Sequence, residues 1–157
     1  MNKMRLSVIG RTNIGKSTLV NSLTKSNNMI ICDKPGTTRD NIILCTKKYN
    51  KYYDIIDTPG IRKNVKTRLD GIYIEKSIES VKLSDISILL IDINQMLTKA
   101  DNLLLNVKDM HFYIIVFNKC DLVKKSFLIR LENLLKFKLK FNYIFISAKH
   151  KSKEHTT

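Results

Sequence analysis

Eight residues near the start of the chain have the types and spacing that can hold a phosphate group. They are Gly10, Arg11, Thr12, Asn13, Ile14, Gly15, Lys16 and Ser17, which fit the pattern G-x-x-x-x-G-K-[ST]. The glycines permit a tight turn whose backbone N–H groups point inward at phosphate oxygens. The Lys16 ammonium can reach the β- and γ-phosphates of a nucleotide, and the Ser17 hydroxyl can ligate Mg²⁺. The stretch, with Thr18 beside it, therefore predicts a phosphate loop.

The segments on either side of this loop support the prediction. The short apolar run Arg5–Ile9 precedes it, and Leu19, Val20 and Leu23 follow it at helical spacing. A strand, a glycine-rich loop and a helix in this order place the positive end of the helix dipole at the phosphates. The alternative is a glycine-rich turn that holds no ligand.

A second candidate site follows the apolar run Tyr52–Ile56. Its residues are Asp57, Thr58, Pro59 and Gly60, with Ile61 next in the chain. Asp57 can hold the hydration shell of Mg²⁺, and the Gly60 N–H can meet a γ-phosphate. The pattern D-x-x-G is usually only a turn, but its place on an apolar strand downstream of a phosphate loop favours nucleotide binding.

A base-recognition site is predicted at the end of the run Phe112–Phe117. Its residues are Asn118, Lys119, Cys120 and Asp121. The Asp121 carboxylate can accept from both N1–H and the 2-amino group of guanine, a donor pair that adenine lacks. Asn118 can brace the loop, and the Lys119 stem can lie over the base. The alternative is a polar loop that only starts a helix.

Two further loops complete the predicted site. Backbone N–H groups in the tripeptide formed by Ser147, Ala148 and Lys149 can meet the guanine O6, although the tripeptide alone is weakly informative. In the loop 35–40, the hydroxyl of Thr38 is favoured over that of Thr37 as a Mg²⁺ ligand that is released on hydrolysis. The alternative for Thr38 is an ordinary polar loop residue.

Strand-like apolar runs alternate with helical patterns along the whole chain. This predicts a three-layer α/β architecture whose mostly parallel sheet has one antiparallel edge, formed by a hairpin around residues 49–52. Strands are predicted at Arg5–Ile9, Asn41–Tyr49, Tyr52–Asp57, Ile86–Asp92, Phe112–Asn118 and Tyr143–Ser147. Helices are predicted at Lys16–Leu23, Gly71–Leu83, Thr98–Val107 and Ser126–Leu135. Ligands of such sheets bind at the carboxyl ends of the strands, where every motif above lies.

Composition limits the class of protein and its partners. A chain of 157 residues with 43% hydrophobic residues suits one globular domain. No membrane-length apolar run or secretory signal is found, so we expect a cytoplasmic protein that does not insert into membranes. We expect no DNA partner. The three cysteines form no metal or disulfide pattern and are expected to be buried or idle thiols. The three histidines match no catalytic arrangement and are expected at the surface.

The net charge of +14 leaves two interpretations open. A basic cluster at residues 124–140 interleaves with Phe127, Leu128, Leu131, Leu134 and Leu135, which predicts an amphipathic helix with a basic outer face. That face either is simply solvated or contacts RNA. A/T-rich codon usage can also account for much of the lysine content.

Taken in order and at these spacings, GxxxxGKS, TTRD, DTPG, NKCD and SAK resemble the five motifs of translation-factor-class GTPases. The stretches GRTNIGKSTLVNSL, PGTTRD and DTPGIRK are similar to the Era/MnmE/Der (EngA) group. Gly60–Lys63 and the stretch 71–80 most resemble the second GTPase domain of Der. The resemblance implies a Ras-like G domain over residues 1–149 that binds GTP or GDP with Mg²⁺ held by Ser17, Thr38 and Asp57.

Two departures from the Ras-type pattern are informative. Ile61 stands where many GTPases carry a water-orienting glutamine, and the resemblance implies that Asn13 instead helps to hold K⁺ beside the phosphates. The residues expected to act in hydrolysis are then Asn13, Lys16, Thr38 and Gly60. The alternative for Asn13 is a side chain that stabilises the turn. Residues 150–157 are a polar tail where the family continues into a helix that covers the sheet, so one sheet face is expected to be undercovered.

Three functions are compatible with these residues. The leading one is a GTPase with a Der-like role in assembly of the large ribosomal subunit and an rRNA-rich partner, in a chain expected to lack the partner GTPase domain and the KH-like domain of Der. The second is a nucleotide- or RNA-binding module with negligible turnover. The third is an MnmE-like GTPase of tRNA modification.

Overall fold

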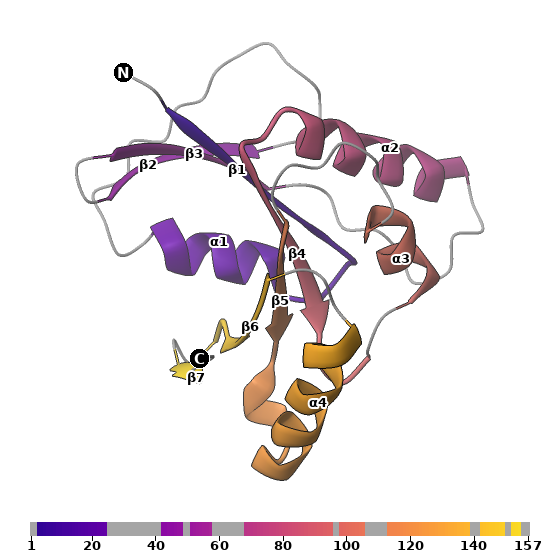
Figure 1. The fold of residues 1–157 in the computed structure, drawn as a ribbon. Coiled ribbons are helices and arrows are strands. Elements are labelled where there is room, and N and C mark those ends of the chain that lie inside the picture. The colour runs from indigo at the N-terminus through magenta and orange to yellow at the C-terminus, as the bar shows by residue number, and fades with distance from the viewer. Residues whose placement is uncertain are drawn as a thin grey trace.

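Parallel strands at the centre of one sheet dominate the computed structural model (Figure 1), which describes residues 3–24, 42–48, 51–57, 68–95, 98–105, 113–138, 142–149 and 152–154, in places by backbone alone. The sheet has the strand order β2-β3-β1-β4-β5-β6-β7. The strands are β1 (Met4–Gly10), β2 (Ile42–Lys48), β3 (Lys51–Asp57), β4 (Ile86–Asp92), β5 (Tyr113–Asn118), β6 (Asn142–Ser147) and β7 (Ser152–Glu154). The helices are α1 (Lys16–Thr24), α2 (Arg68–Lys82), α3 (Lys99–Leu105) and α4 (Lys125–Lys138), with the 3-10 helix η1 (Cys120–Leu122).

Central strands are buried on both faces because their apolar residues run without alternation. Along β4, Leu89 and Ile91 join one hydrophobic cluster while Leu90, between them, joins the other. The same division separates Val8 from Ile9 on β1. Successive side chains of a strand point to opposite faces, so a continuous apolar run fills two cores at once.

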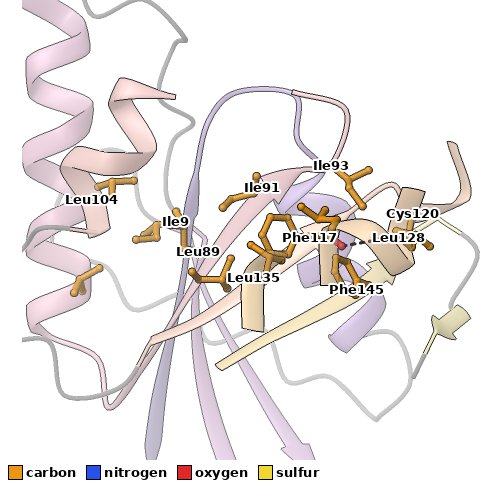
Figure 2. Close-up of a cluster of buried hydrophobic side chains, with 13 residues drawn as sticks. Ile9, Leu89, Ile91, Ile93, Leu104, Phe117, Cys120, Leu128, Leu135 and Phe145 are labelled. Carbon is orange, nitrogen blue, oxygen red and sulfur yellow. Dashed lines mark hydrogen bonds between the residues drawn. The ribbon is translucent and has the colours of Figure 1, made fainter. Parts of the chain in front are cut away.

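Helices cover the two faces unequally. Residues of α2, α3 and α4, including Val81, Leu104 and Leu131, pack on the larger cluster with Phe117 and Phe145 of the sheet (Figure 2). The helix α1 lies on the opposite face (Figure 1). It contributes Leu19 and Val20 to the cluster of that face. The sheet is therefore the middle of three layers, as the sequence predicts.

Coverage of the α1 face is incomplete near β6. Ile146 packs on the cluster of that face, whereas Ile144, two residues earlier on the same side of the strand, is 39% exposed. The expectation that one sheet face is undercovered stays a prediction. The predicted division into residues 1–149 and a tail 150–157 stays a prediction.

All ten predicted strands and helices are present, with ends displaced by a few residues. The antiparallel edge is confirmed, since β2 pairs with β3 from Ile42–Asp57 to Lys48–Lys51. Two elements are additional: η1, and β7, which pairs antiparallel with β6 at the opposite edge. Because β7 is short and polar, periodicity offers no signal for it.

The predicted apolar face of α4 is only partly correct. Leu128, Leu131 and Leu135 are buried, but Phe127 and Leu134 are 41% and 57% exposed. Residues 127 and 134 lie about 100° around the helix from 128 and 135. The sheet therefore covers the stripe formed by residues 128, 131 and 135, and the side chains beside that stripe stay exposed.

The remaining general expectations concern thiols, histidines and membrane spans. Cys45 and Cys120 are buried thiols that form no disulfide, as predicted, whereas Cys32 and the three histidines lie outside the described residues. Within the part of the chain that the structure describes, no helix has the length and apolar character needed to cross a membrane.

Candidate nucleotide-binding site

The phosphate loop connects β1 to α1 through three residues with positive φ. These are Gly10 (φ 142°), Asn13 (φ 61°) and Gly15 (φ 98°). A Cβ on Gly15 would lie 2.5 Å from Nδ2 of Asn118, and one on Gly10 would lie 2.6 Å from the carbonyl oxygen of Leu90. Both glycines are therefore required by backbone conformation and by lack of space. Asn13 is exposed, and asparagine is among the residues that best tolerate this left-handed conformation.

Lys16 is held over the loop by the loop's own backbone. Its side chain is largely buried, and its Nζ donates to the carbonyl oxygens of Gly10 at 3.2 Å and of Arg11 at 2.8 Å. The helix α1 begins at Lys16, where Leu19 N donates to Gly15 O at 2.9 Å. The arrangement places a cation and a helix N-terminus together, which suits an anionic ligand.

Other residues of the loop differ in their exposure. Thr12, Ser17 and Thr18 are exposed, whereas the side chain of Ile14 is buried in the α1-face cluster and that of Arg11 is buried towards α3. The side chains of Ile14 and Arg11 thus support the loop from below, and their backbone remains the part that a phosphate can meet.

Asn118 joins three of the predicted motifs. Its Nδ2 donates to the carbonyl oxygen of Ile14 at 2.8 Å, and its Oδ1 accepts from the backbone N–H of Ala148 at 2.9 Å. One side-chain amide therefore fixes the spacing between the phosphate loop, the loop after β5 and the loop after β6. All of these contacts lie at the carboxyl ends of parallel strands, the expected place for a ligand.

Lys119 occupies a left-handed backbone position, with φ 68° and ψ 35°. Its Nζ donates to the carbonyl oxygen of Asn13 at 3.0 Å and to Oδ2 of Asp92 at 2.7 Å. Its stem therefore runs across the gap between the loop after β5 and the phosphate loop.

Asp121 and Cys120 point in different directions. Asp121 is exposed in η1, whereas Cys120 is buried in the larger hydrophobic cluster, where its Sγ donates to the carbonyl oxygen of Phe117 at 3.2 Å. The Asp121 side chain is thus accessible to a ligand, whereas Cys120 can contact a ligand only through its backbone. In the last motif, Ser147 and Ala148 are buried and Lys149 is exposed.

The remaining predicted residues are described in part or not at all. Asp57 is described by its backbone, which places it at the carboxyl end of β3 in register with Val8 of β1, beside the phosphate loop. Thr38, Thr58, Pro59, Gly60 and Ile61 lie outside the described residues.

Three residues between the end of β4 and the first turn of α3 were not predicted to belong to the site. Asp92 contacts Lys119, while Gln95 and Asp101 contact Arg11. The one available sequence signal was the position of Asp92, an acidic residue at the carboxyl end of a strand in a parallel sheet. Nothing local in the sequence connects Asp101 to the phosphate loop.

The environment of Asp92 favours its charged form. Burial by itself would raise the pKa of this carboxyl group, but the hydrogen bonds from Lys119 and from the backbone N–H of Asn94 outweigh it, so the pKa of Asp92 lies below its ordinary value. Asp92 is consequently ionised at neutral pH. Among the described residues, no group of three or more His, Cys, Asp or Glu side chains forms a metal site.

Comparison with known proteins assigns the family. The family model described as 50S ribosome-binding GTPase matches residues 5–119, from β1 through the phosphate loop to Lys119. The chain belongs to this family of GTPases. Its resemblance to the Era and Der type, predicted from the motifs, is confirmed.

Individual GTPases of this kind resemble the chain over nearly its full length. It is 37% identical over 155 residues to GTPase Der of Buchnera aphidicola subsp. Schizaphis graminum (strain Sg), covering 94% of this chain and 34% of that protein. It is 40% identical over 156 residues to GTPase Der of Prochlorococcus marinus (strain MIT 9215), covering 93% and 34%. The chain thus spans about a third of the length of these curated relatives.

A solved GTPase has the same fold. Era in complex with MgGDPNP and nucleotides 1506–1542 of 16S ribosomal RNA is similar at a TM-score of 0.72 and 26% identity, over 94% of this chain and 52% of that one. The similarity supports the three-layer P-loop architecture.

Proposed function

We propose that this chain binds guanine nucleotides and hydrolyses GTP to GDP and phosphate. The observation that carries the proposal is the pair of hydrogen bonds made by Asn118, because they link the phosphate loop to the two loops predicted to read the base. With these loops at a constant separation, a ligand that carries both a base and phosphates at the matching distance is bound better than either part alone.

Guanine specificity is assigned to Asp121. Its carboxylate is exposed in η1. In the chain it follows closely on Asn118 and Lys119, whose side chains contact the phosphate loop. An acceptor-only carboxylate matches the two donors of guanine and would be left unpaired by adenine. Asp121 in this role rejects adenine nucleotides rather than merely binding guanine ones.

Mg²⁺ is the metal that fits the chemistry of the predicted ligands. Ser17 lies in the first turn of α1 with its side chain exposed, and hydroxyl and carboxylate oxygens are the donors that Mg²⁺ prefers. Ser17 and Thr38 would hold the ion directly and Asp57 through water, and the ion would neutralise charge on the β- and γ-phosphates. The protein's own part is to orient the phosphates, through Lys16, the loop N–H groups and the Gly60 N–H, for attack by water.

Asn13 is assigned to K⁺ beside the phosphates. Its side chain is exposed and lies on the loop whose backbone Lys119 contacts, while Ile61 cannot orient water. The ion would add positive charge where negative charge develops in the transition state. The left-handed conformation of Asn13 gives a second, structural reason for an asparagine at this position.

Titration with a fluorescent GDP, with and without Mg²⁺, tests the binding proposal. We expect saturable binding that GTP and GDP displace and ATP does not. Absence of binding, or equal displacement by ATP, would refute it. Single-turnover hydrolysis of GTP then separates an enzyme from a binding module, since a module would release GTP unchanged.

A ribosomal RNA partner extends the proposal. Support comes from the family description, from the Era complex with 16S rRNA and from the net charge of +14. On α4 and the residue before it, Lys124, Lys125, Arg130 and Lys136 are exposed. Sedimentation of the chain with large ribosomal subunits at increasing salt tests the Der-like role, because phosphate contacts by lysines predict release as salt rises. Failure to sediment at low salt would count against it.

A further inference from the structure

A buried arginine ties the phosphate loop to the start of α3. The Arg11 side chain is 1% exposed, and its Nε lies 3.2 Å from Oδ2 of Asp101, whose side chain is 0% exposed. Its Nη1 donates to Oε1 of Gln95 at 3.0 Å. The motif chemistry assigns no role to Gln95 or Asp101, although both contact a residue of the phosphate loop.

An ion pair this deeply buried is not explained by stability alone. The cost of removing two charges from water is often as large as their attraction, and an apolar pair of similar volume would serve a hydrophobic core as well or better. What the pair provides is a defined geometry, because each charge can be satisfied in few arrangements. In the arrangement that the structure shows, the Arg11 guanidinium contacts both Asp101 and Gln95.

Asp101 is itself fixed in position by the helix that carries it. Its Oδ2 accepts from the backbone N–H and from the Oγ1 of Thr98, each at 2.8 Å, as in a helix-capping arrangement. Its Oδ1 is buried and has no hydrogen-bond partner among the residues that the structure describes. The carboxylate is therefore anchored to the first turn of α3 and depends on Arg11 for its counter-charge.

Arg11 transmits this anchorage to the residue that meets the phosphates. Its carbonyl oxygen accepts a 2.8 Å hydrogen bond from Nζ of Lys16. A shift of the Arg11 side chain would move its backbone, and with it the Lys16 ammonium and the neighbouring N–H groups. The chain of contacts thus runs from Asp101 through Arg11 to Lys16.

We propose that Asp101, assisted by Gln95, is a positioning residue for the phosphate loop, and that through Arg11 it holds the loop in the shape that binds the β-phosphate of a guanine nucleotide. The proposal rests on the proposed function, because it assumes that guanine nucleotides are the ligands. It assigns Gln95 and Asp101 to the binding of the diphosphate rather than of the base.

The preference for GDP over GMP measures this role directly. GMP lacks the β-phosphate, so its affinity reports the base, ribose and α-phosphate contacts, whereas GDP adds the contacts that the phosphate loop and Lys16 make with the β-phosphate. Loosening the loop weakens GDP binding while GMP binding changes little. A purely structural role of Asp101 would lower the melting temperature and leave the ratio of the two affinities unchanged.

The experiment measures Kd for GDP and for GMP by competition with a fluorescent guanine nucleotide, and thermal unfolding without nucleotide. The full chain is compared with Asp101→Asn, which is isosteric, with Gln95→Met, which removes only the contact to Arg11, and with the exposed control Glu79→Gln on α2. We expect Asp101→Asn to weaken GDP binding roughly tenfold or more with little change for GMP. Gln95→Met should show a smaller loss in the same direction, and Glu79→Gln none.

Two results would overturn the proposal. One is a folded Asp101→Asn variant with the parent's GDP-to-GMP preference, and the other is an equal loss for both nucleotides. If Asp101→Asn does not fold, Gln95→Met decides, and an unchanged preference in that variant refutes the proposal. Failure of the unmodified chain to bind any guanine nucleotide would instead refute the proposed function, so the two failures are distinguishable.

Discussion

The Lys119 ammonium lies 2.7 Å from Oδ2 of Asp92, at the carboxyl ends of two neighbouring strands. The same ammonium donates to the backbone of Asn13 in the phosphate loop. A single cation thus connects three segments that are far apart in the sequence. Because the carboxylate of Asp92 is buried, the pair holds Lys119 in one direction rather than leaving it free in solvent.

The lowered pKa of Asp92 predicts a pH-dependent contribution to stability. A carboxyl group whose pKa is lower in the folded state stabilises the fold above its unfolded pKa of about 3.9, and this contribution is lost as pH falls through the folded value. We therefore expect Asp92→Asn to be less stable than the parent at pH 7 and the difference to shrink below about pH 4. Urea unfolding between pH 7 and pH 3 measures this, with Glu79→Gln as the exposed control. A difference that is constant with pH would contradict the prediction.

Replacing Asp121 should change which base is bound. In Asp121→Asn, the side-chain amide places a donor where the carboxylate accepted from the 2-amino group, so guanine loses a partner and the 2-oxo group of xanthine gains one. We expect GDP affinity to fall by about a hundredfold or more, and xanthosine diphosphate to become the better competitor. Competition against a labelled nucleotide gives both values. Retained preference for GDP would remove Asp121 from base recognition.

Gly15→Ala should damage nucleotide binding through a steric clash with Asn118. The added Cβ would lie 2.5 Å from Asn118 Nδ2, at a residue with φ 98° that alanine rarely adopts. The strain is of order 1–3 kcal/mol, and its relief displaces the loop or the Asn118 amide. We expect reduced stability together with reduced GDP affinity. Asn21→Ala, on the exposed side of α1, is the matched control and should change neither.

Two leucines of α4 should respond differently to the same substitution. Leu131 is 4% exposed and packs in the larger cluster, whereas Leu134 is 57% exposed. We expect Leu131→Ala to lower the free energy of unfolding by about 2–5 kcal/mol and Leu134→Ala by at most about 0.5 kcal/mol. Chemical unfolding of the two variants measures the contrast, and equal losses would show that Leu134 is buried in solution.

The assignment of K⁺ to Asn13 predicts an ion-specific rate. GTP hydrolysis should be faster in KCl than in NaCl at equal ionic strength, because the larger ion would supply charge beside the phosphates. Asn13→Asp is unsuitable as a probe because it adds charge, so Asn13→Gly, which tolerates the left-handed backbone, is the better variant. It should lose the K⁺ effect while keeping GDP affinity. Equal rates in both salts for the parent would end this assignment.

The amino-acid sequence by itself determined the class of ligand and the order of the elements. The two glycines and Lys16 have the spacing of a phosphate loop, and the apolar runs without alternation predict strands buried on both faces. The predicted strands end where Asp57, Asn118 and Ser147 begin the functional loops, which is where the structure ends them. Such features are local, because a turn or a strand depends mainly on neighbouring residues.

Only the tertiary structure decided how these loops hold one another in place. The strand order places β4 between β1 and β5, and this brings Asp92 to Lys119 and Asp101 to Arg11. In the sequence, Asp101 is simply an acidic residue in the first turn of a predicted helix. Such a position is common and does not indicate which residue it contacts. The direction of Cys120, into the core rather than towards a ligand, depends equally on the packing of α4 over β5 and β6. Pairings between residues distant in the chain are set by which strands lie side by side, and a single sequence does not record that order.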